Sequence, residues 1–135
     1  MEKFEVLEHK ADLKIRAVGK TKEELFRHCL EAMAKTQSSK SKLQKSVKRT
    51  IKIKSLDLSA LLVDFLSEVL YQTQVNKEIY DDIKFKKFTN NEIEGELKGL
   101  KVERFDEDIK AVTHHNLNVA KNRDGVWEAV ILFDI

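Results

Sequence analysis

The sequence predicts an α+β fold with a mainly antiparallel sheet and two amphipathic helices. Apolar residues recur at helical spacing in two separated segments, about 22–36 and 58–74. Around these segments, apolar and polar side chains alternate with the period of two that is typical of half-buried strands. Runs of strands with two separated helices favour antiparallel pairing. The length of 135 residues fits a single domain over residues 1–135.

The first elements are an extended segment over residues 4–18 and the helix that follows Gly19. Thr21 stands three residues before Glu24, which is the spacing of a capping box. In that motif the hydroxyl accepts from the Glu24 amide while the carboxylate reaches back toward the start of the helix. The apolar stripe of this helix consists of Leu25, Phe26, Cys29, Leu30 and Met33.

A polar loop over residues 37–46 is expected to lead into a half-buried strand. In that strand Val47, Ile51 and Ile53 face one side, and lysines alternate with them on the other. Ser55 or Asp57 is expected to cap the second helix. The stripe of the second helix consists of Leu58, Leu61, Leu62, Phe65, Leu66, Val69 and Leu70.

The second half of the chain is predicted to form strands joined by short turns. A strand over 80–88, bent near residues 86–87, is expected to turn at 90–91 and return through 93–97. Residues 109–119 are expected to be extended and to precede a tight turn at 123–125. The final strand, 126–133, is apolar on both faces, which predicts a central strand covered on both sides.

Composition favours a globular protein with a charged surface. Charged residues make up 36% of the chain, yet the net charge is only +2, so no global field selects an acidic partner. The single cysteine, Cys29, lies on the apolar face of the first helix, where a buried and inert thiol is expected. No apolar run approaches the roughly 20 residues that span a bilayer. A cytoplasmic protein without a signal peptide or membrane partner is therefore predicted.

The motifs of common enzyme classes are missing. The four glycines form no phosphate-binding loop, and no Cys/His set suits zinc. Two adjacent histidines, His114 and His115, point to opposite faces of an extended segment, so one exposed and one packed histidine is expected rather than a joint ligand pair. Residues 35–54 carry eight basic and no acidic side chains. This stretch could meet RNA phosphates, but without interleaved aromatic residues a solvated lysine face is the favoured interpretation.

Three acidic groups are candidates for a metal site. Asp12 begins a strand, where on its own it is most simply a turn residue. At the other terminus an apolar strand leads directly to Asp134 and the free carboxylate of Ile135. Close like charges repel unless a cation lies between them. If Asp12 approaches this pair, the three oxygen-bearing groups would suit Ca²⁺, Mg²⁺ or Mn²⁺ rather than zinc, whereas a solvated terminus is the simpler alternative.

These segments together resemble the archease family. The likeness spans nearly the whole chain in the family's order, and its individual motifs are less specific than their combination. The chain departs from the usual family pattern at Lys10, Phe65 and His114, where threonine, tryptophan and tyrosine are common. None of these departures removes a carboxylate. The resembling segments are residues 9–12, 19–21, 61–70, 109–117 and 130–135.

The resemblance implies a protein cofactor of the tRNA-splicing RNA ligase, not an enzyme. That ligase joins a 3′-phosphate or 2′,3′-cyclic-phosphate RNA end to a 5′-hydroxyl end. Archease-like proteins promote guanylylation of its catalytic histidine, restore multiple turnover and broaden nucleotide use. By this resemblance, Asp12, Asp134 and the Ile135 carboxylate would bind a divalent cation, calcium above all, at the mouth of the ligase active site. Second-rank candidates for the partner-binding face are His9, Asp64, Lys110 and His115.

Two other functions remain alternatives at this point. One is a small RNA-binding or chaperone-like module that uses residues 35–54, whose affinity for RNA would fall steeply with salt. The other is a metal-dependent hydrolase that uses the same carboxylates with His115 as general base.

Overall fold

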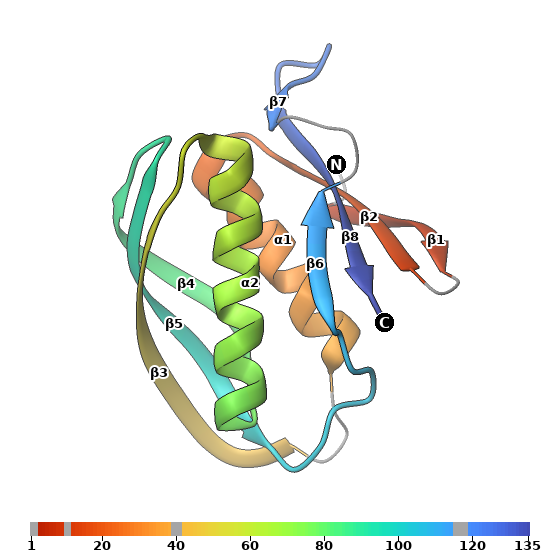
Figure 1. Ribbon diagram of the computed structural model, residues 1–135, viewed down its shortest axis with the longest axis vertical. Coiled ribbons are helices and arrows are strands. Elements are labelled where there is room, and N and C mark those ends of the chain that lie inside the picture. Colours follow the sequence, from red (N-terminus) through yellow and green to blue (C-terminus); the bar gives the residue numbers. More distant parts are fainter. Residues whose placement is uncertain (1–2, 10–11, 39–41, 115–118) are drawn as a thin grey trace.

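The computed structural model describes residues 3–9, 12–38, 42–114 and 119–135. The described residues form two antiparallel sheets and two helices, which bears out the predicted α+β class (Figure 1). The five-stranded sheet has the order β1 (Phe4–His9), β2 (Asp12–Gly19), β8 (Trp127–Asp134) and β6 (Ala111–His114), with β7 (Ala120–Lys121) also paired to β8. The three-stranded sheet has the order β3 (Lys42–Lys54), β5 (Glu92–Val102) and β4 (Glu78–Phe88).

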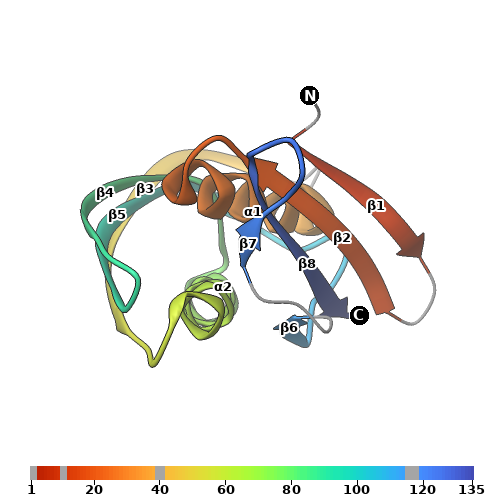
Figure 2. The same cartoon turned by 90° about the horizontal axis from the view of Figure 1, so that it is seen from above.

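Two helices fill the space between the sheets (Figure 2). Helix α1 (Lys22–Gln37) packs against β2 and β4, and α2 (Leu58–Asn76) packs against β6 and the three-stranded sheet. A buried apolar cluster draws on both helices and both sheets, so each sheet buries one face against the same core. Four phenylalanine rings in and against this cluster pack on one another: Phe26, Phe65, Phe85 and Phe88.

The helix starts follow the local signals in the sequence. Thr21 Oγ1 accepts from the Glu24 amide at 3.0 Å, as predicted, while Glu24 Oε1 reaches back to the Lys20 amide at 3.2 Å, one residue before the N-cap Thr21. Asp57, not Ser55, caps α2, because its Oδ1 accepts from the Ala60 amide at 2.8 Å. The helices end at residues 37 and 76, one and two residues later than predicted.

The predicted loop over 37–46 is wrong in its second half. Strand β3 begins at Lys42, where the chain already pairs with Val102 of β5, and its register is irregular between Lys42 and Ser46. Strand β3 is an edge strand, and polar side chains do not prevent an edge strand from pairing through its backbone. The polar composition that predicted a loop therefore did not determine the conformation of the backbone.

Strands β4 and β5 are longer than predicted and pair with two irregularities. One lies between Phe85 and Lys87, which confirms the bend expected near residues 86–87. Near the other irregularity, the backbones approach so closely that a Cβ at Gly99 would lie 2.1 Å from the Ile79 carbonyl oxygen. A glycine is therefore required where β5 crosses the start of β4.

The C-terminal half contains the expected turn and central strand. Gly125 has a φ of 76° in the turn between β7 and β8, and β8 lies between β2 on one side and β6 and β7 on the other. Of the extended segment predicted over 109–119, residues 111–114 form a strand and 115–118 lie outside the described residues. In the described part of the chain, Val130 and Leu132 lie opposite Arg16 and Lys14 of β2 on the non-core face, so side chains rather than a further layer shield that face.

Candidate functional site

The structure brings the two predicted aspartates together. Asp12 begins β2, Asp134 ends β8, and the two are directly paired in the antiparallel register. Residues opposite each other in such a pair have Cβ atoms roughly 4.5–5.5 Å apart. Both side chains are exposed. The register of two strands, 122 positions apart in sequence at this point, therefore places both carboxylates where two neighbouring interior strands of the five-stranded sheet end.

Two further predicted residues lie at the same place. The Lys110 amide donates to the Asp134 carbonyl oxygen at 2.7 Å, and the Lys110 side chain is exposed. Ile135 follows Asp134 and packs its half-buried side chain against the core, which anchors the backbone that carries the carboxylate. We refer to Asp12, Lys110, Asp134 and Ile135 as the carboxylate end.

The other second-rank candidates are placed differently. His9 ends β1, and its backbone pairs with Leu13, next to Asp12. Asp64 lies on α2 and accepts a hydrogen bond from the Ser55 hydroxyl. The part of α2 that lies next to the carboxylate end is marked by Gln74, whose amide donates to the Ile109 carbonyl oxygen. Asp64 is ten residues earlier in the helix, which corresponds to a rise of roughly 15 Å. Asp64 is therefore not part of this site, and His115 lies outside the described residues.

The donor atoms of the carboxylate end fit a hard cation. All of them are carboxylate oxygens, which are ligands that Ca²⁺, Mg²⁺ and Mn²⁺ prefer. Among the described residues, no three side chains of His, Cys, Asp or Glu form a metal-binding group. What these groups bind stays a prediction.

The basic stretch over 35–54 does not form a purely positive surface where the structure describes it. Strand β3 presents lysines on the outward face of the three-stranded sheet, and β5 presents glutamates beside them. Lys52 Nζ lies 3.3 Å from Glu94 Oε1, and Lys48 Nζ lies 4.0 Å from Glu96 Oε1. Lys54 pairs in register with Glu92. We call this set of residues the charge ladder, and its mixed sign disfavours the RNA-binding interpretation of this face.

One protein family matches almost the entire sequence. The model of the Archease protein family (MTH1598/TM1083) matches residues 4–135. The chain belongs to the archease family. Protein archease of Methanosarcina barkeri is 36% identical over 140 residues, which cover 98% of this chain and 95% of that protein. Protein archease of Pyrococcus furiosus is 32% identical, with 100% of both chains covered. The resemblance inferred from sequence motifs is thus confirmed.

Solved structures of archease relatives have the same fold. The solution structure of Methanobacterium thermoautotrophicum protein 1598 matches with a TM-score of 0.75 and 27% identity over 100% of both chains. The crystal structure of an archease from Thermotoga maritima, described as a possible chaperone, matches with a TM-score of 0.70 and 18% identity. That match covers 97% of this chain and 96% of the other. No helix among the described residues is long and apolar enough to cross a membrane.

An ionic network around the buried Glu78 of this archease-family chain was not predicted. Glu78 is 1% exposed, and it accepts from Arg49 Nε at 2.9 Å, from Arg49 Nη2 at 2.8 Å and from the Tyr80 hydroxyl at 2.6 Å. The hydrogen bonds from Arg49 lower the pKa of Glu78. Burial, with the bond to Glu78 adding to it, raises the pKa of Tyr80 to about 12. No local sequence signal links these residues, which lie on β3 and β4 of the same sheet.

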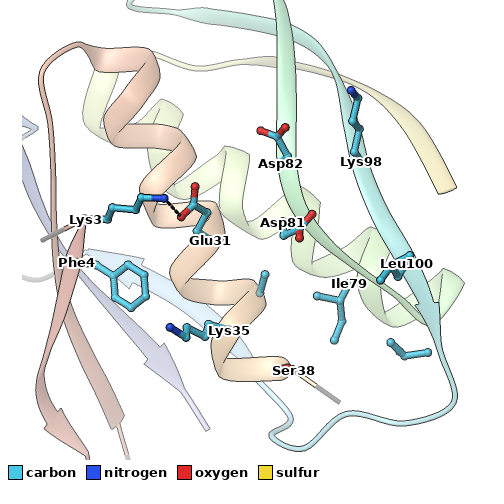
Figure 3. A pocket seen from close by; sticks show the side chains of 12 residues that line it. Lys3, Phe4, Glu31, Lys35, Ser38, Ile79, Asp81, Asp82, Lys98 and Leu100 are labelled. Atoms are coloured by element: carbon cyan, nitrogen blue, oxygen red, sulfur yellow. Dashed lines mark hydrogen bonds and ion pairs between the residues drawn. The ribbon is translucent and has the colours of Figure 1, made fainter. Parts of the chain in front are cut away.

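Cys29 and a surface hollow both lie outside the carboxylate end. Burial raises the pKa of the Cys29 thiol to about 12, in agreement with the inert cysteine that was predicted. A hollow of about 780 Å³ lies between α1 and strands β4 and β5 (Figure 3). Its lysines and carboxylates are equal in number, and Lys3 pairs with Glu31 at 3.1 Å. The hollow contains no residue of the carboxylate end, and its balanced charge selects neither anions nor cations.

Proposed function

We propose that this chain activates an RNA ligase that joins a 3′-phosphate or 2′,3′-cyclic-phosphate RNA end to a 5′-hydroxyl end. Membership of the archease family supports this class of function. The direct register pairing of Asp12 with Asp134 is the observation that carries the choice of residues. In this proposal the chain has no catalytic site of its own, and its partner is the catalytic subunit of the ligase.

The carboxylate end would dock at the mouth of the ligase active site. Both aspartates are exposed at the ends of two neighbouring strands, so a second protein can reach them without a conformational change in this chain. Asp12, Asp134 and the Ile135 carboxylate would hold a divalent cation, with calcium as the first choice and Mg²⁺ or Mn²⁺ as the others. When bound, the ion would supply positive charge next to the phosphates handled by the ligase.

Each residue of the carboxylate end would have its own part in docking. The backbone bond from the Lys110 amide to the Asp134 carbonyl would hold the orientation of the final residues, while the exposed ammonium of Lys110 would face the partner. His9, at the end of β1, would border the same contact. Better placement of the ligase histidine and nucleotide would then promote guanylylation, sustain multiple turnover and widen the choice of nucleotide.

The competing functions have less support. The charge ladder leaves the described part of the 35–54 region with mixed sign, which weakens the proposal of an RNA-binding module there. The description as a possible chaperone belongs to the Thermotoga maritima protein. A metal-dependent hydrolase would need a general base beside the carboxylates, and hydrolysis of a phosphoester by the isolated protein would favour it.

The test is ligase guanylylation with labelled GTP, in the presence of the wild-type chain or of Asp12→Asn. We expect the wild type to stimulate labelling of the ligase and Asp12→Asn to stimulate it hardly at all, because one of two paired carboxylates is lost. Asp81→Asn is the matched control, since it removes an exposed carboxylate from β4. Asp64→Asn should also behave as wild type. Full stimulation by Asp12→Asn would eliminate the carboxylate end from the mechanism.

A calcium titration tests cation binding independently of binding to the ligase. Calorimetric titration of the isolated protein should show binding by the wild type and loss of binding in Asp12→Asn and Asp134→Asn. If calcium, magnesium and manganese all fail to bind while ligase stimulation still depends on Asp12, the carboxylates act on the ligase directly and the cation is not part of the site.

A further inference from the structure

Two lysine ammonium groups lie near the ring of Trp127, the only tryptophan of the chain. Lys22 Nζ lies 4.9 Å from the centroid of the Trp127 ring, and Lys121 Nζ lies 5.7 Å from it. The Lys22 ammonium also donates to Asn90 Oδ1 at 2.6 Å, which holds it in place. Lys121 is exposed and has the freedom of a long side chain. One of the two cations at this ring is therefore fixed and the other is free to move.

Part of the Trp127 ring is accessible. Trp127 is half-buried and packs against the core cluster, and on the β2 side the space at its partner Gly19 is filled by the backbone of α1 at Glu24 and Leu25. Its partner on the other side is Lys121 of β7. Rotation of the Lys121 side chain would therefore uncover ring surface without any movement of the backbone.

The cations near Trp127 differ from those of the charge ladder. Lys20, Lys121 and Arg123 are exposed, and among the described residues no carboxylate lies within ion-pair distance of them. Two nearby carboxylates have partners of their own. Glu24 accepts from the Lys20 amide in the helix cap, and Glu128 pairs with Arg16 at 3.2 Å on the other face of the sheet. Positive side chains therefore gather around an aromatic ring, with the exposed carboxylate of Asp124 beside Arg123 in the same turn.

This surface is separate from the carboxylate end. Trp127 begins β8 and Asp134 ends it, so the two positions are roughly 24 Å apart along an extended strand. In Figure 1 the turn after β7 projects at the top of the molecule, whereas the C-terminus lies at the lower right. A ligand at Trp127 therefore need not compete with a partner at Asp134.

We propose that Lys22, Lys121, Arg123 and Trp127 form a site for an unpaired nucleobase and its flanking phosphates, as presented by a single strand of RNA or DNA. The base would stack on the Trp127 face that Lys121 uncovers, because every base has a π-face that an aromatic side chain can meet. Lys121 and Arg123 would turn to the phosphates. Phosphate contacts by exposed cations make such binding strongly dependent on salt. The site goes beyond the proposed activation of a ligase and requires none of its residues.

Trp127 itself provides the measurement, because it is the only tryptophan. Oligouridylate RNA and oligothymidylate DNA should each quench its fluorescence at low salt, and added salt should reverse the effect. Comparison of the two strands identifies the nucleic acid that binds better. Absence of quenching by either strand at low salt, together with unchanged anisotropy of a labelled strand, would overturn the proposal.

Variants distinguish this site from general attraction to positive charge. Lys121→Ala combined with Arg123→Ala should weaken binding at least tenfold and reduce the salt dependence, while Trp127 stays in place. Lys52→Ala of the charge ladder is the matched control and should bind as wild type. Trp127→Leu, followed by anisotropy of the labelled strand, should lose affinity about 5- to 150-fold. An equal loss in Lys52→Ala and in the double variant would contradict a specific site.

Discussion

At the scale of single residues, the sequence nominates some of the charged residues that the fold brings together and misses others. Asp12 and Asp134 could be nominated because each is an acidic residue at the boundary of an apolar strand, and the register then brings them together. Asp64 was nominated through the family resemblance instead; it lies on α2 away from this pair and accepts a hydrogen bond from the Ser55 hydroxyl. Glu78 was missed altogether, because its burial depends on Arg49, which lies 29 positions earlier. Residue type suggests chemistry, but only tertiary pairing selects among the candidates.

Glu78→Gln should destabilise the protein in a pH-dependent manner. Arg49 lowers the pKa of Glu78 in the folded state, so its ionic contribution is present above the unfolded value near 4.3 and is lost as pH falls through the folded pKa. At pH 7 the free energy of unfolding should fall by about 1–3 kcal/mol. Urea unfolding between pH 3 and pH 7 measures this effect. Glu94→Gln, on the exposed charge ladder, should change stability little; an equal loss in both variants would refute the special role of Glu78.

At the scale of elements, local signals fix where helices begin better than where strands begin. The capping box at Thr21 was predicted because all of its groups lie within four residues of one another. The start of β3 at Lys42 was not predicted, because it depends on pairing with Val102, far along the chain. The bend near residues 86–87 was predicted although it lies in a strand, because the alternation of apolar and polar side chains breaks there in the sequence.

Thr21→Ala should reduce the free energy of unfolding by about 1 kcal/mol, the usual value of a helix cap. The reason is the loss of the bond from the Glu24 amide to Thr21 Oγ1. Thr21→Ser retains the hydroxyl and should stay within a few tenths of the wild type. Denaturant unfolding of the three proteins side by side measures both values. A Thr21→Ala variant with the same free energy of unfolding as the wild type would show that the cap does not stabilise α1.

At the scale of the whole molecule, the sequence predicted the class of fold but not the division into two sheets. The central place of β8 followed from its apolar residues on both faces, and β8 does lie between β2 and β6. The strand order depends on connections across the chain, which periodicity does not contain. The two sheets are expected to depend on each other for stability because they share one core. In that core the ring centroid of Phe65 on α2 lies 5.7 Å from that of Phe26 on α1 and 6.3 Å from that of Phe85 on β4.

Phe65→Ala should destabilise both sheets together, by about 3–5 kcal/mol. Trp127 fluorescence reports the five-stranded sheet, and far-ultraviolet circular dichroism reports the entire fold. The two transitions should coincide in the wild type and shift equally in Phe65→Ala. Tyr71→Ala, at a position that is 59% exposed on the same helix, should change stability by less than about 0.5 kcal/mol. Separate transitions for the two probes would show that the sheets unfold independently.

The central position of β8 also fixes the distance between the two ends of this strand. A strand that is hydrogen-bonded along both edges cannot stretch or shorten, so its first and last side chains keep a constant separation of roughly 24 Å. Any molecule that touches Trp127 and Asp134 at once must bridge that gap. The strand would therefore act as a rigid spacer, holding a nucleic-acid strand at one end and a protein at the other.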